Sequence, residues 1–358
     1  MLGSINKRYK ETYTLPFDQE IPNYIDHYSG QIMSFYRIFK FFKRYLLLFV
    51  SGQLSKEKKL ITSDVRKIIW INLSASSLGD SLMDLSSRAL LEQFEVDLIT
   101  SDKNSFLYAD DKIFNKVFTD KNFVEKNKYD LVIMDSYSSR TLKVKTKFFR
   151  NLNFVSMFGF FNGPEVNRVM FSFHKMNHLL KNKLTPEEIR ALSKPSIFFN
   201  TKDINFVKEM QLKKPYIAIA IGGEWSYRTY KYWDIVVKFI LKKYKSYSIV
   251  LLGSENGVDY AKQLELTNTD RVINYVNRLS FKVTSLIINE SSLFICCDGG
   301  LMHASNAELN KIIPLFARLT PSMQLTDIVP AFPLFNQEDV NNISAEKVNT
   351  KISKLLSS

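Results

Sequence analysis

The feature that most constrains this chain is a repeated alternation of short apolar runs with helical patterns. The runs are continuous rather than alternating, which is typical of strands buried on both faces of a parallel sheet. They predict strands at 67–73, 96–100, 131–135, 154–158, 168–173, 216–221, 248–252, 271–275, 293–297 and 311–316. Helices are predicted at 80–93, 232–244, 259–266 and 281–289. Because the strand–helix alternation occurs twice, it predicts two doubly wound α/β domains.

The two halves of this pattern are separated by a polar stretch at 174–214, which is rich in lysine and asparagine and contains prolines. We therefore predict three parts. These are a basic and aromatic N-terminal extension at 1–60, a Rossmann-like domain at 61–205 and a second Rossmann-like domain at 206–358.

The charge of the chain points to an acidic partner. Its 358 residues include 49 lysines and arginines against 36 aspartates and glutamates, a net charge of +13. Nucleic acid, an anionic membrane surface or a phosphorylated substrate would fit this balance. No nucleic-acid-binding signature accompanies the charge, so nucleic acid is the least favoured of the three. The only two cysteines are adjacent, which excludes a disulfide framework and a structural zinc site.

Part of this charge lies in a predicted helix at 31–50, where Arg37, Lys40, Lys43 and Arg44 are interleaved with aromatic residues and no acid occurs. A basic stripe beside aromatic faces is typical of a helix lying on a membrane surface. Its uncharged stretch is too short to span a bilayer. The alternatives are a helix that packs its aromatics on the main body and a helix that binds a partner.

A second basic cluster, at 140–150, follows a predicted strand and contains five positive charges. Such a run is usually a solvated face, but the carboxyl end of a strand is also a common ligand-binding position. The cluster therefore either contacts an anionic ligand or is exposed to solvent.

The first of three informative turns, at 72–80, places Gly79 and the carboxylate of Asp80 directly after the first strand. Turns of this kind are where α/β domains place ligand chemistry. Taken alone, however, such an aspartate more often caps the helix that follows, a contact worth roughly 1 kcal/mol.

The second turn, at 222–230, opens with Gly222 and Gly223 and contains Arg228. The glycines leave backbone N–H groups accessible, and the guanidinium can donate several hydrogen bonds to a phosphate. The glycine spacing matches neither the dinucleotide fingerprint nor a P-loop. The alternative is an ordinary loop with a surface arginine.

The third turn reads DGGLMHA at 298–304. A buried strand ends at Asp298, a glycine pair forms the corner, and a helix begins near Leu301. Free backbone N–H groups and the helix dipole predict an anion site suited to a diphosphate. His303 either donates to the same phosphates or is a packed histidine satisfied by backbone groups.

Together, the order and spacing of these turns resemble glycosyltransferase family 9, the heptosyltransferases of lipopolysaccharide core assembly. The family motifs SxxGD, a glycine-led loop with a basic and an aromatic residue, and DTGLxH correspond to 76–80, 222–230 and 298–303. The segment LFARLTP at 315–321 is similar to the family's LFGxTxP, with Ala317 in place of glycine. The resemblance covers about residues 67–330 and implies the GT-B fold, two Rossmann-like domains facing a central cleft, here with an N-terminal helical extension.

The resemblance also implies an inverting, metal-independent reaction in which Asp80 is the catalytic base. No cofactor is expected apart from the nucleotide-sugar substrate. The candidates for donor binding are Gly222, Gly223, Glu224, Arg228, Glu255, Leu279, Asp298, Gly299, Gly300, Leu301 and His303. The candidates for acceptor binding are Ser77, Gly79, Arg140, Lys143 and Lys145. Gly299 stands where the family has threonine, which favours a phosphate grip by backbone alone.

The leading hypothesis is transfer of heptose from ADP-heptose to an anionic lipopolysaccharide or lipooligosaccharide acceptor, either Kdo–lipid A or a heptosylated core. We expect a cytoplasmic enzyme in peripheral contact with the inner face of a bacterial inner membrane, and no nucleic-acid partner. One alternative keeps the fold but uses another nucleotide sugar or a protein acceptor. A second is a non-catalytic module that binds polyanions or membranes, and a third is other GT-B-like chemistry such as sugar-nucleotide epimerisation.

Overall fold

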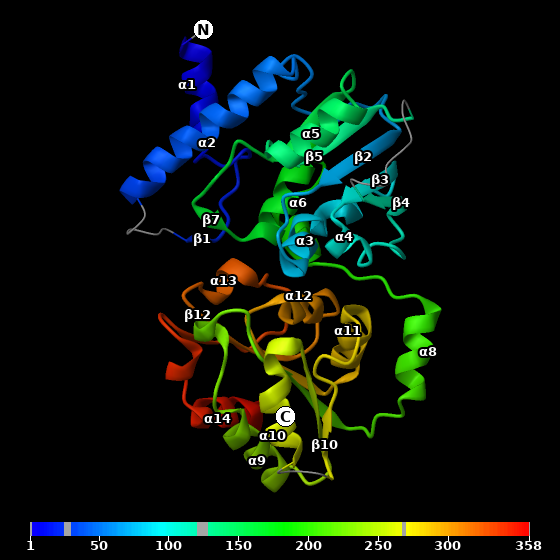
Figure 1. Cartoon of the computed structure of the whole chain (residues 1–358), viewed down its shortest axis with the longest axis vertical. Helices are drawn as coiled ribbons and strands as arrows, with labels where there is room; N and C mark the ends of the chain where they lie inside the picture. Colours follow the sequence, from blue (N-terminus) through cyan, green and yellow to red (C-terminus); the bar gives the residue numbers. More distant parts are fainter. Residues whose placement is uncertain (1, 25–29, 120–127, 267–269, 358) are drawn as a thin grey trace. The chain divides into compact units, whose positions relative to one another are not determined.

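The computed structural model describes residues 2–24, 30–119, 128–266 and 270–357 (Figure 1). Contacts within the chain divide it into two units, Met1–Phe198 and Phe199–Ser358. This division lies inside the polar segment 174–214. The segment is not an extended linker, since it contains the end of α6 (Arg168–Leu179) and the whole of α7 (Pro186–Leu192) and α8 (Thr201–Glu209).

Unit 1 is built on a five-stranded parallel sheet with the order β4-β3-β2-β5-β6. The strands are β2 (Lys67–Asn72), β3 (Glu95–Thr100), β4 (Phe114–Thr119), β5 (Leu131–Ser136) and β6 (Asn153–Gly159). In chain order this is 3-2-1-4-5, so the direction of winding reverses between β2 and β5. Open α/β sheets bind ligands at such a switch point, beyond the carboxyl ends of the strands. A separate antiparallel pair joins β1 (Asn23–Tyr24) to β7 (Glu165–Val166).

Helices cover both faces of this sheet. On one face, Phe41 and Leu48 of α2 (Gly30–Val50) and Leu142 of α5 (Ser139–Phe148) share a core cluster with sheet residues such as Ile71. α1 (Leu2–Lys10) adds to this side, because the Tyr9 ring lies 5.4 Å from that of Phe41. The other helices of the unit include α3 (Leu78–Asp84), α4 (Asp102–Ser105) and the short 3₁₀ helix η1 (Ser86–Leu91), and α3 and η1 contact α6.

Unit 2 is built on a six-stranded parallel sheet with the order β10-β9-β8-β11-β12-β13. The strands are β8 (Tyr216–Ile221), β9 (Ser248–Gly253), β10 (Val272–Asn274), β11 (Leu293–Cys297), β12 (Ile312–Ala317) and β13 (Leu334–Asn336). In chain order this is 3-2-1-4-5-6, the dinucleotide-domain order, with its switch point between β8 and β11.

The central strand β8 packs helices on both faces. Its isoleucines enter one core cluster with α9 (Trp233–Lys243), α10 (Val258–Leu266) and α14 (Ala345–Leu356). Tyr216, Ala218 and Ala220 point to the opposite face and enter a second core cluster, with α8, α11 (Phe281–Glu290) and α12 (Gly300–Ala307). The remaining helices are the short α13 (Pro321–Gln324) and three 3₁₀ turns, η2 (Ser226–Arg228), η3 (Glu255–Gly257) and η4 (Val340–Asn342). The predicted fold class, two Rossmann-like α/β domains, is confirmed.

Each predicted strand is present to within one residue at either end, except one. The strand predicted at 168–173 is wrong, because these residues begin α6, capped by the Asn167 side chain, which accepts from the Met170 N–H. A short apolar run cannot by periodicity alone be distinguished from a buried helix. The helix predicted at 80–93 is interrupted after Asp84, where Leu85 ends α3 and the Ser86 hydroxyl donates to the Met83 carbonyl at 2.7 Å.

The helix predicted at 31–50 is confirmed as α2, although the side chains of 31–34 lie outside the described residues. Of its four basic residues only Lys43 is exposed, whereas Arg37, Lys40 and Arg44 are half-buried. Arg44 Nη1 donates to the Phe160 carbonyl at 3.3 Å, and Lys40 Nζ donates to Asn162. Within the part of the chain that the structure describes, no helix is long and apolar enough to cross a bilayer.

Candidate active site

Two loops at the switch point of unit 1 are joined by Asp135, at the carboxyl end of β5. Its Oδ2 accepts from the backbone N–H groups of Leu73 and Ser74, at 2.7 and 2.6 Å, and its Oδ1 accepts from the Thr141 hydroxyl at 2.7 Å. Asp135 is buried, and burial raises the pKa of its carboxyl group. The carboxylate therefore fixes the start of the turn that leads to Asp80.

Asp80 lies in the first turn of α3 but does not cap this helix. The cap is Ser77, whose hydroxyl oxygen accepts from the Asp80 N–H at 3.1 Å. The alternative that Asp80 is the N-cap is therefore wrong. The Asp80 carboxylate accepts from the Ser76 hydroxyl at 2.8 Å and is about one quarter exposed, at 23% of the side chain.

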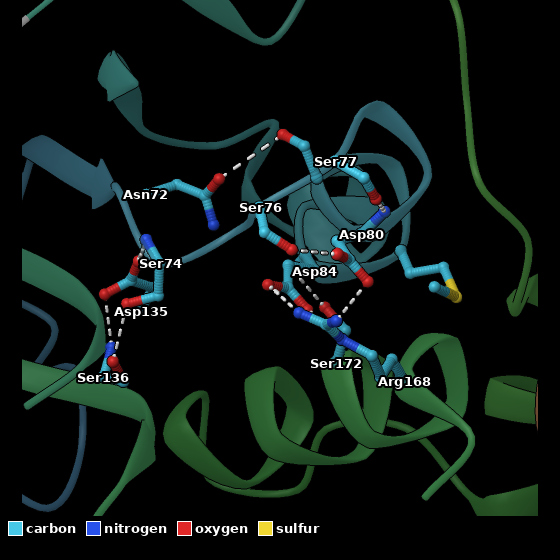
Figure 2. Close-up of polar contacts among 12 residues, drawn as sticks. Asn72, Ser74, Ser76, Ser77, Asp80, Asp84, Asp135, Ser136, Arg168 and Ser172 are labelled. Atoms are coloured by element: carbon cyan, nitrogen blue, oxygen red, sulfur yellow. Dashed lines mark hydrogen bonds and ion pairs between the residues drawn. The ribbon is translucent and has the colours of Figure 1, made fainter. Parts of the chain in front are cut away.

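The other partner of Asp80 is Arg168, which α6 places between two carboxylates (Figure 2). Arg168 Nη1 pairs with Asp80 Oδ1. Its Nε and Nη2 donate to the two oxygens of Asp84 at 2.8 and 2.6 Å. Asp84 is buried at 3% side-chain exposure, so Arg168 is anchored on a buried carboxylate and presents its third nitrogen to Asp80. Neither Arg168 nor Asp84 was among the site residues predicted from the sequence.

The charges of this group follow from burial and pairing. Burial raises the pKa of Asp84 to about 6, with the positive Arg168 acting in the opposite direction. For Arg168, burial acts to lower the pKa, but the carboxylates of Asp84 and Asp80 outweigh it, so its pKa is raised. At neutral pH the guanidinium is thus charged, and it forms an ion pair with Asp80 as well as with Asp84.

The raised pKa of Asp84 makes a prediction for stability. A carboxyl group with a higher pKa in the folded chain holds its proton more tightly there. The contribution of Asp84 to the free energy of unfolding is therefore largest at low pH. It is lost as the pH rises from 3.8, the ordinary pKa of an aspartate, to about 6, the pKa of Asp84 in the folded chain. Relative to Asp84→Asn, the wild-type free energy of unfolding should fall by about 3 kcal/mol across this window. Urea denaturation of both proteins at several pH values measures this, and a constant difference between them would contradict it.

The acceptor candidates divide by exposure. Arg140 and Lys143 are exposed on α5, whereas Gly79 is buried inside α3. Lys145 is buried, and its ammonium donates to the Gln53 side chain at 2.5 Å and to the carbonyls of Phe149 and Leu152, both at 2.9 Å. Since these bonds direct its charge into the protein, we no longer propose Lys145 as an acceptor-binding residue.

In unit 2, the predicted donor-binding residues lie at the carboxyl ends of four neighbouring strands. Gly222 to Arg228 follow β8, and Glu255 follows β9. Leu279 follows β10, and the residues from Asp298 to His303 follow β11. Parallel strands bring all these segments to one edge of the sheet, the edge at which α/β folds bind ligands.

The glycines in these loops differ in whether a Cβ atom would fit at their position. Gly222 has a φ of +92°, and a Cβ there would lie 2.6 Å from Asn256 Oδ1. A Cβ on Gly223 would lie 2.5 Å from the Arg228 carbonyl oxygen. These two positions require glycine because neighbouring chain approaches closely. Gly299, in contrast, is extended, and a Cβ there would meet nothing within 4 Å.

This contrast supplies a matched pair of variants. Gly223→Ala should force the loop to shift, destabilising the protein by about 1–3 kcal/mol and weakening the nucleotide binding that the sequence predicts for Arg228. Gly299→Ala adds the same methyl group into open space, so it should cost only the N-cap preference for glycine over alanine, about 0.5–1 kcal/mol. Thermal unfolding and ADP titration of both variants measure these effects. Equal destabilisation by the two changes would refute the assigned packing.

Arg228 connects the loops after β8 and β11. Its Nη1 pairs with Asp298 Oδ2 at 3.1 Å, and the arginine retains 21% side-chain exposure while the aspartate has 2%. The Tyr227 ring lies near two cations, with Arg228 Cζ at 5.4 Å and Arg318 Cζ at 3.8 Å from its centroid. Arg318, in the LFARLTP segment, is exposed and adds a positive charge that the sequence analysis did not assign.

The helix α12 begins at this edge as predicted. Gly299 is its N-cap, and no side chain caps the helix. His303 is buried in the first turn, at 3% exposure, and Leu301 packs against the second core cluster of the unit. Because no side chain caps α12, its first backbone N–H groups can bind an anion. With the open space at Gly299 and the nearby Arg228, this helix start suits a phosphate group. Among the described residues, no three histidine, cysteine, aspartate or glutamate side chains are grouped so that they could hold a metal ion.

Comparison with solved structures defines the class of this fold. The chain is similar to a family 9 glycosyltransferase from Veillonella parvula, with a TM-score of 0.68, 14% identity and coverage of 84% of this chain and 100% of that one. It is also similar to E. coli ADP-heptose LPS heptosyltransferase II, with a TM-score of 0.63, 16% identity and coverage of 81% and 98%. For E. coli heptosyltransferase WaaC with ADP, the TM-score is 0.62 at 12% identity, with coverage of 80% and 99%. The fold is therefore that of GT-B glycosyltransferases.

The family follows from the sequence itself. The profile of glycosyltransferase family 9 (heptosyltransferase) matches residues 162–348, more than half of the chain. The chain belongs to this family and is a glycosyltransferase, which confirms the resemblance described above. A search of curated proteins found no match.

Proposed function

We propose that this protein is an inverting glycosyltransferase that transfers heptose from ADP-heptose to an anionic glycolipid of the lipopolysaccharide inner core. The proposal rests on the way the Asp80 side chain is held by its neighbours. Its carboxylate is partly exposed at the carboxyl edge of unit 1 and is oriented by Ser76 and by Arg168, which is itself anchored on buried Asp84. A carboxylate held in this way suits a general base.

In the proposed reaction, Asp80 accepts the proton of an acceptor hydroxyl while that oxygen attacks the anomeric carbon of the sugar. The new bond forms on the face opposite the nucleotide, and the bond from the anomeric carbon to the phosphate oxygen breaks. ADP leaves with the electron pair of that bond. Ser76 and Arg168 orient the base and contribute no atoms to the product.

The charge that develops on the leaving diphosphate would be stabilised in unit 2. Arg228 and the backbone N–H groups at the start of α12 are the proposed contacts, because preorganised donors act most strongly where charge develops. His303 is proposed to assist them, and Asp298 to orient Arg228. Glu224 and Glu255 are both exposed and are proposed to line the sugar and ribose. Leu279, which is half-buried, is proposed to line the adenine.

The positive charge of exposed residues on α5 is the basis for the proposed acceptor site. Arg140 and Lys143 are exposed on α5, and the chain has a net charge of +13, which suits a phosphorylated, acidic glycolipid. Such an acceptor would place the enzyme at the cytoplasmic face of an inner membrane. One structural neighbour, E. coli ADP-heptose LPS heptosyltransferase II, supports this donor and this class of acceptor.

A ligand panel separates this proposal from its alternatives. ADP and ADP-heptose should stabilise the protein against heat, since a ligand at 100 times its Kd adds roughly 2.7 kcal/mol, and UDP- and GDP-sugars should not. Arg228→Met should abolish the shift, with Lys231→Met as a control outside the predicted site. A shift with another nucleotide sugar alone would favour the same fold with a different donor. Binding to polyanions without any nucleotide effect would favour a non-catalytic module.

A further inference from the structure

One face of α2 is apolar and exposed. Five large side chains recur along it at spacings of four and three residues, which places them on one side of a helix. Their exposures are far above those of core residues: Phe35 77%, Phe39 63%, Phe42 53%, Leu46 60% and Phe49 62%. Scattered exposed apolar residues are common, but a continuous row of this kind marks an interaction surface. We call this row the α2 face.

The orientation of α2 is fixed from the opposite side. Phe41 and Leu48 are buried at 1% and 0% exposure in the core of unit 1. Arg44 is bonded to the Phe160 carbonyl, and Arg37 lies 5.9 Å from the Tyr13 ring. Because one side of the helix is held by these contacts, the α2 face cannot rotate inward without breaking them.

The charged side chains of α1 and α2 are all basic, although Arg8 pairs with Glu57. Neither α1 nor α2 contains an acidic residue, and together they carry seven basic ones. Lys7 and Lys10 of α1 and Lys43 of α2 are exposed. The two helices, drawn in blue in Figure 1, are in contact through the Tyr9 and Phe41 rings. An apolar row beside exposed lysines is complementary to a surface that is apolar inside and negative outside.

We propose that the α2 face docks on an anionic phospholipid bilayer, with its phenylalanines and leucine among the upper acyl chains and the neighbouring lysines at the phosphates. Amphipathic helices that lie in the interface bury their apolar face about 5–10 Å into the headgroup boundary. A second copy of the chain is the weaker candidate for this surface. Pairing two such helices would bring together two segments that are basic and free of acid.

This inference deepens the proposed function, and it rests on it only for the membrane location of the acceptor. Docking along α2 would hold unit 1, which carries Asp80, against the layer that contains a glycolipid acceptor. It also changes which residues carry the contact. Arg37, Lys40 and Arg44 contact the protein itself, so the α2 face and Lys43, rather than the whole basic set, should decide binding.

Vesicle flotation tests the proposal with the full-length protein. Wild type should float with vesicles of phosphatidylglycerol and phosphatidylcholine, and less with phosphatidylcholine alone. Phe39→Ser/Phe42→Ser should lower partitioning by about tenfold or more, and Lys43→Glu should weaken only the phosphatidylglycerol-dependent part. The matched control is Phe206→Ser/Leu266→Ser, which removes two apolar side chains exposed at 47% and 77% on α8 and α10. It should float like wild type.

ADP binding, measured on the same samples, separates failure of this inference from failure of the proposed function. Loss of flotation in the α2 variant with unchanged ADP affinity supports the docking surface. If wild type binds ADP but does not float, the docking proposal is wrong and the proposed function stands. If wild type floats through α2 but binds no nucleotide, the docking proposal stands and the proposed function is wrong. A change of oligomeric state in the α2 variant, with flotation unchanged, would assign the face to a second copy and overturn the proposal.

Discussion

Replacing Asp80 with asparagine should lower sugar transfer by about 10²–10⁴-fold, the usual contribution of a general base, and should leave ADP binding unchanged. Asparagine keeps the shape of the side chain and an oxygen that can still accept from Arg168, so the loss would reflect chemistry rather than misfolding. Initial rates of ADP release in the presence of acceptor measure transfer, and calorimetry measures the ADP affinity.

The matched control for this experiment is Ser76→Ala. It removes one hydrogen bond to the Asp80 carboxylate, made at 2.8 Å, but leaves the base in place. We expect a loss of about tenfold or less, since a hydrogen bond to a charged group is worth about 1.5–3 kcal/mol and water can replace part of this one at the partly exposed Asp80. Transfer by Asp80→Asn at a near-normal rate would mean that another group accepts the proton.

Replacing Arg168 with methionine should be the most destabilising change in the site. It leaves the carboxylate of Asp84 buried without its positive partner, and breaking a buried pair from one side costs about 3–5 kcal/mol. The double variant Arg168→Met/Asp84→Asn removes both charges and should recover a large part of this loss. Urea denaturation of wild type, both single variants and the double variant gives the coupling between the two residues.

A second buried pair in the same unit distinguishes stability from function. Arg88 Nε donates to Asp111 Oδ2 at 2.7 Å, and the two side chains are 1% and 0% exposed. Asp111→Asn should therefore destabilise unit 1 without touching Asp80. At a temperature where all variants are folded, the double variant of Arg168 and Asp84 should still transfer more slowly than Asp111→Asn. Equal rates would show that Arg168 and Asp84 serve stability alone.

The strands could be predicted because their apolar runs are continuous and well separated, as in YIAIAI at 216–221. In a chain that winds twice, this also predicts that the following turns lie at one edge of each sheet. The turns that hold Asp80 and Gly299 were thus found from sequence. Which glycines need to be glycine was not, because that depends on backbone from another loop, such as the carbonyl of Arg228 beside Gly223.

Arg168 and Asp84 were missed for two physical reasons. The run after Arg168 is as apolar as a strand and was interpreted as one, although burial on nearly all sides of α6 produces the same pattern. Asp84, within a predicted helix, looks like an ordinary solvated acid until its burial is known. The α2 segment shows the converse. Its composition predicted a helix with basic and aromatic faces, but only packing determines that Phe41 is buried while Phe35, Phe39, Phe42 and Phe49 face outward.

The central claim is that a base on unit 1 drives inverting transfer from a nucleotide diphosphate sugar, and the configuration of the product tests it most directly. Wild-type protein would be incubated with ADP-heptose and a lipid A acceptor carrying Kdo, and the anomeric configuration of the new linkage would be determined by NMR alongside ADP release. We expect one ADP released for each heptose transferred, with the configuration of the donor inverted. Retention of configuration, or release of ADP without a glycosylated acceptor, would contradict it.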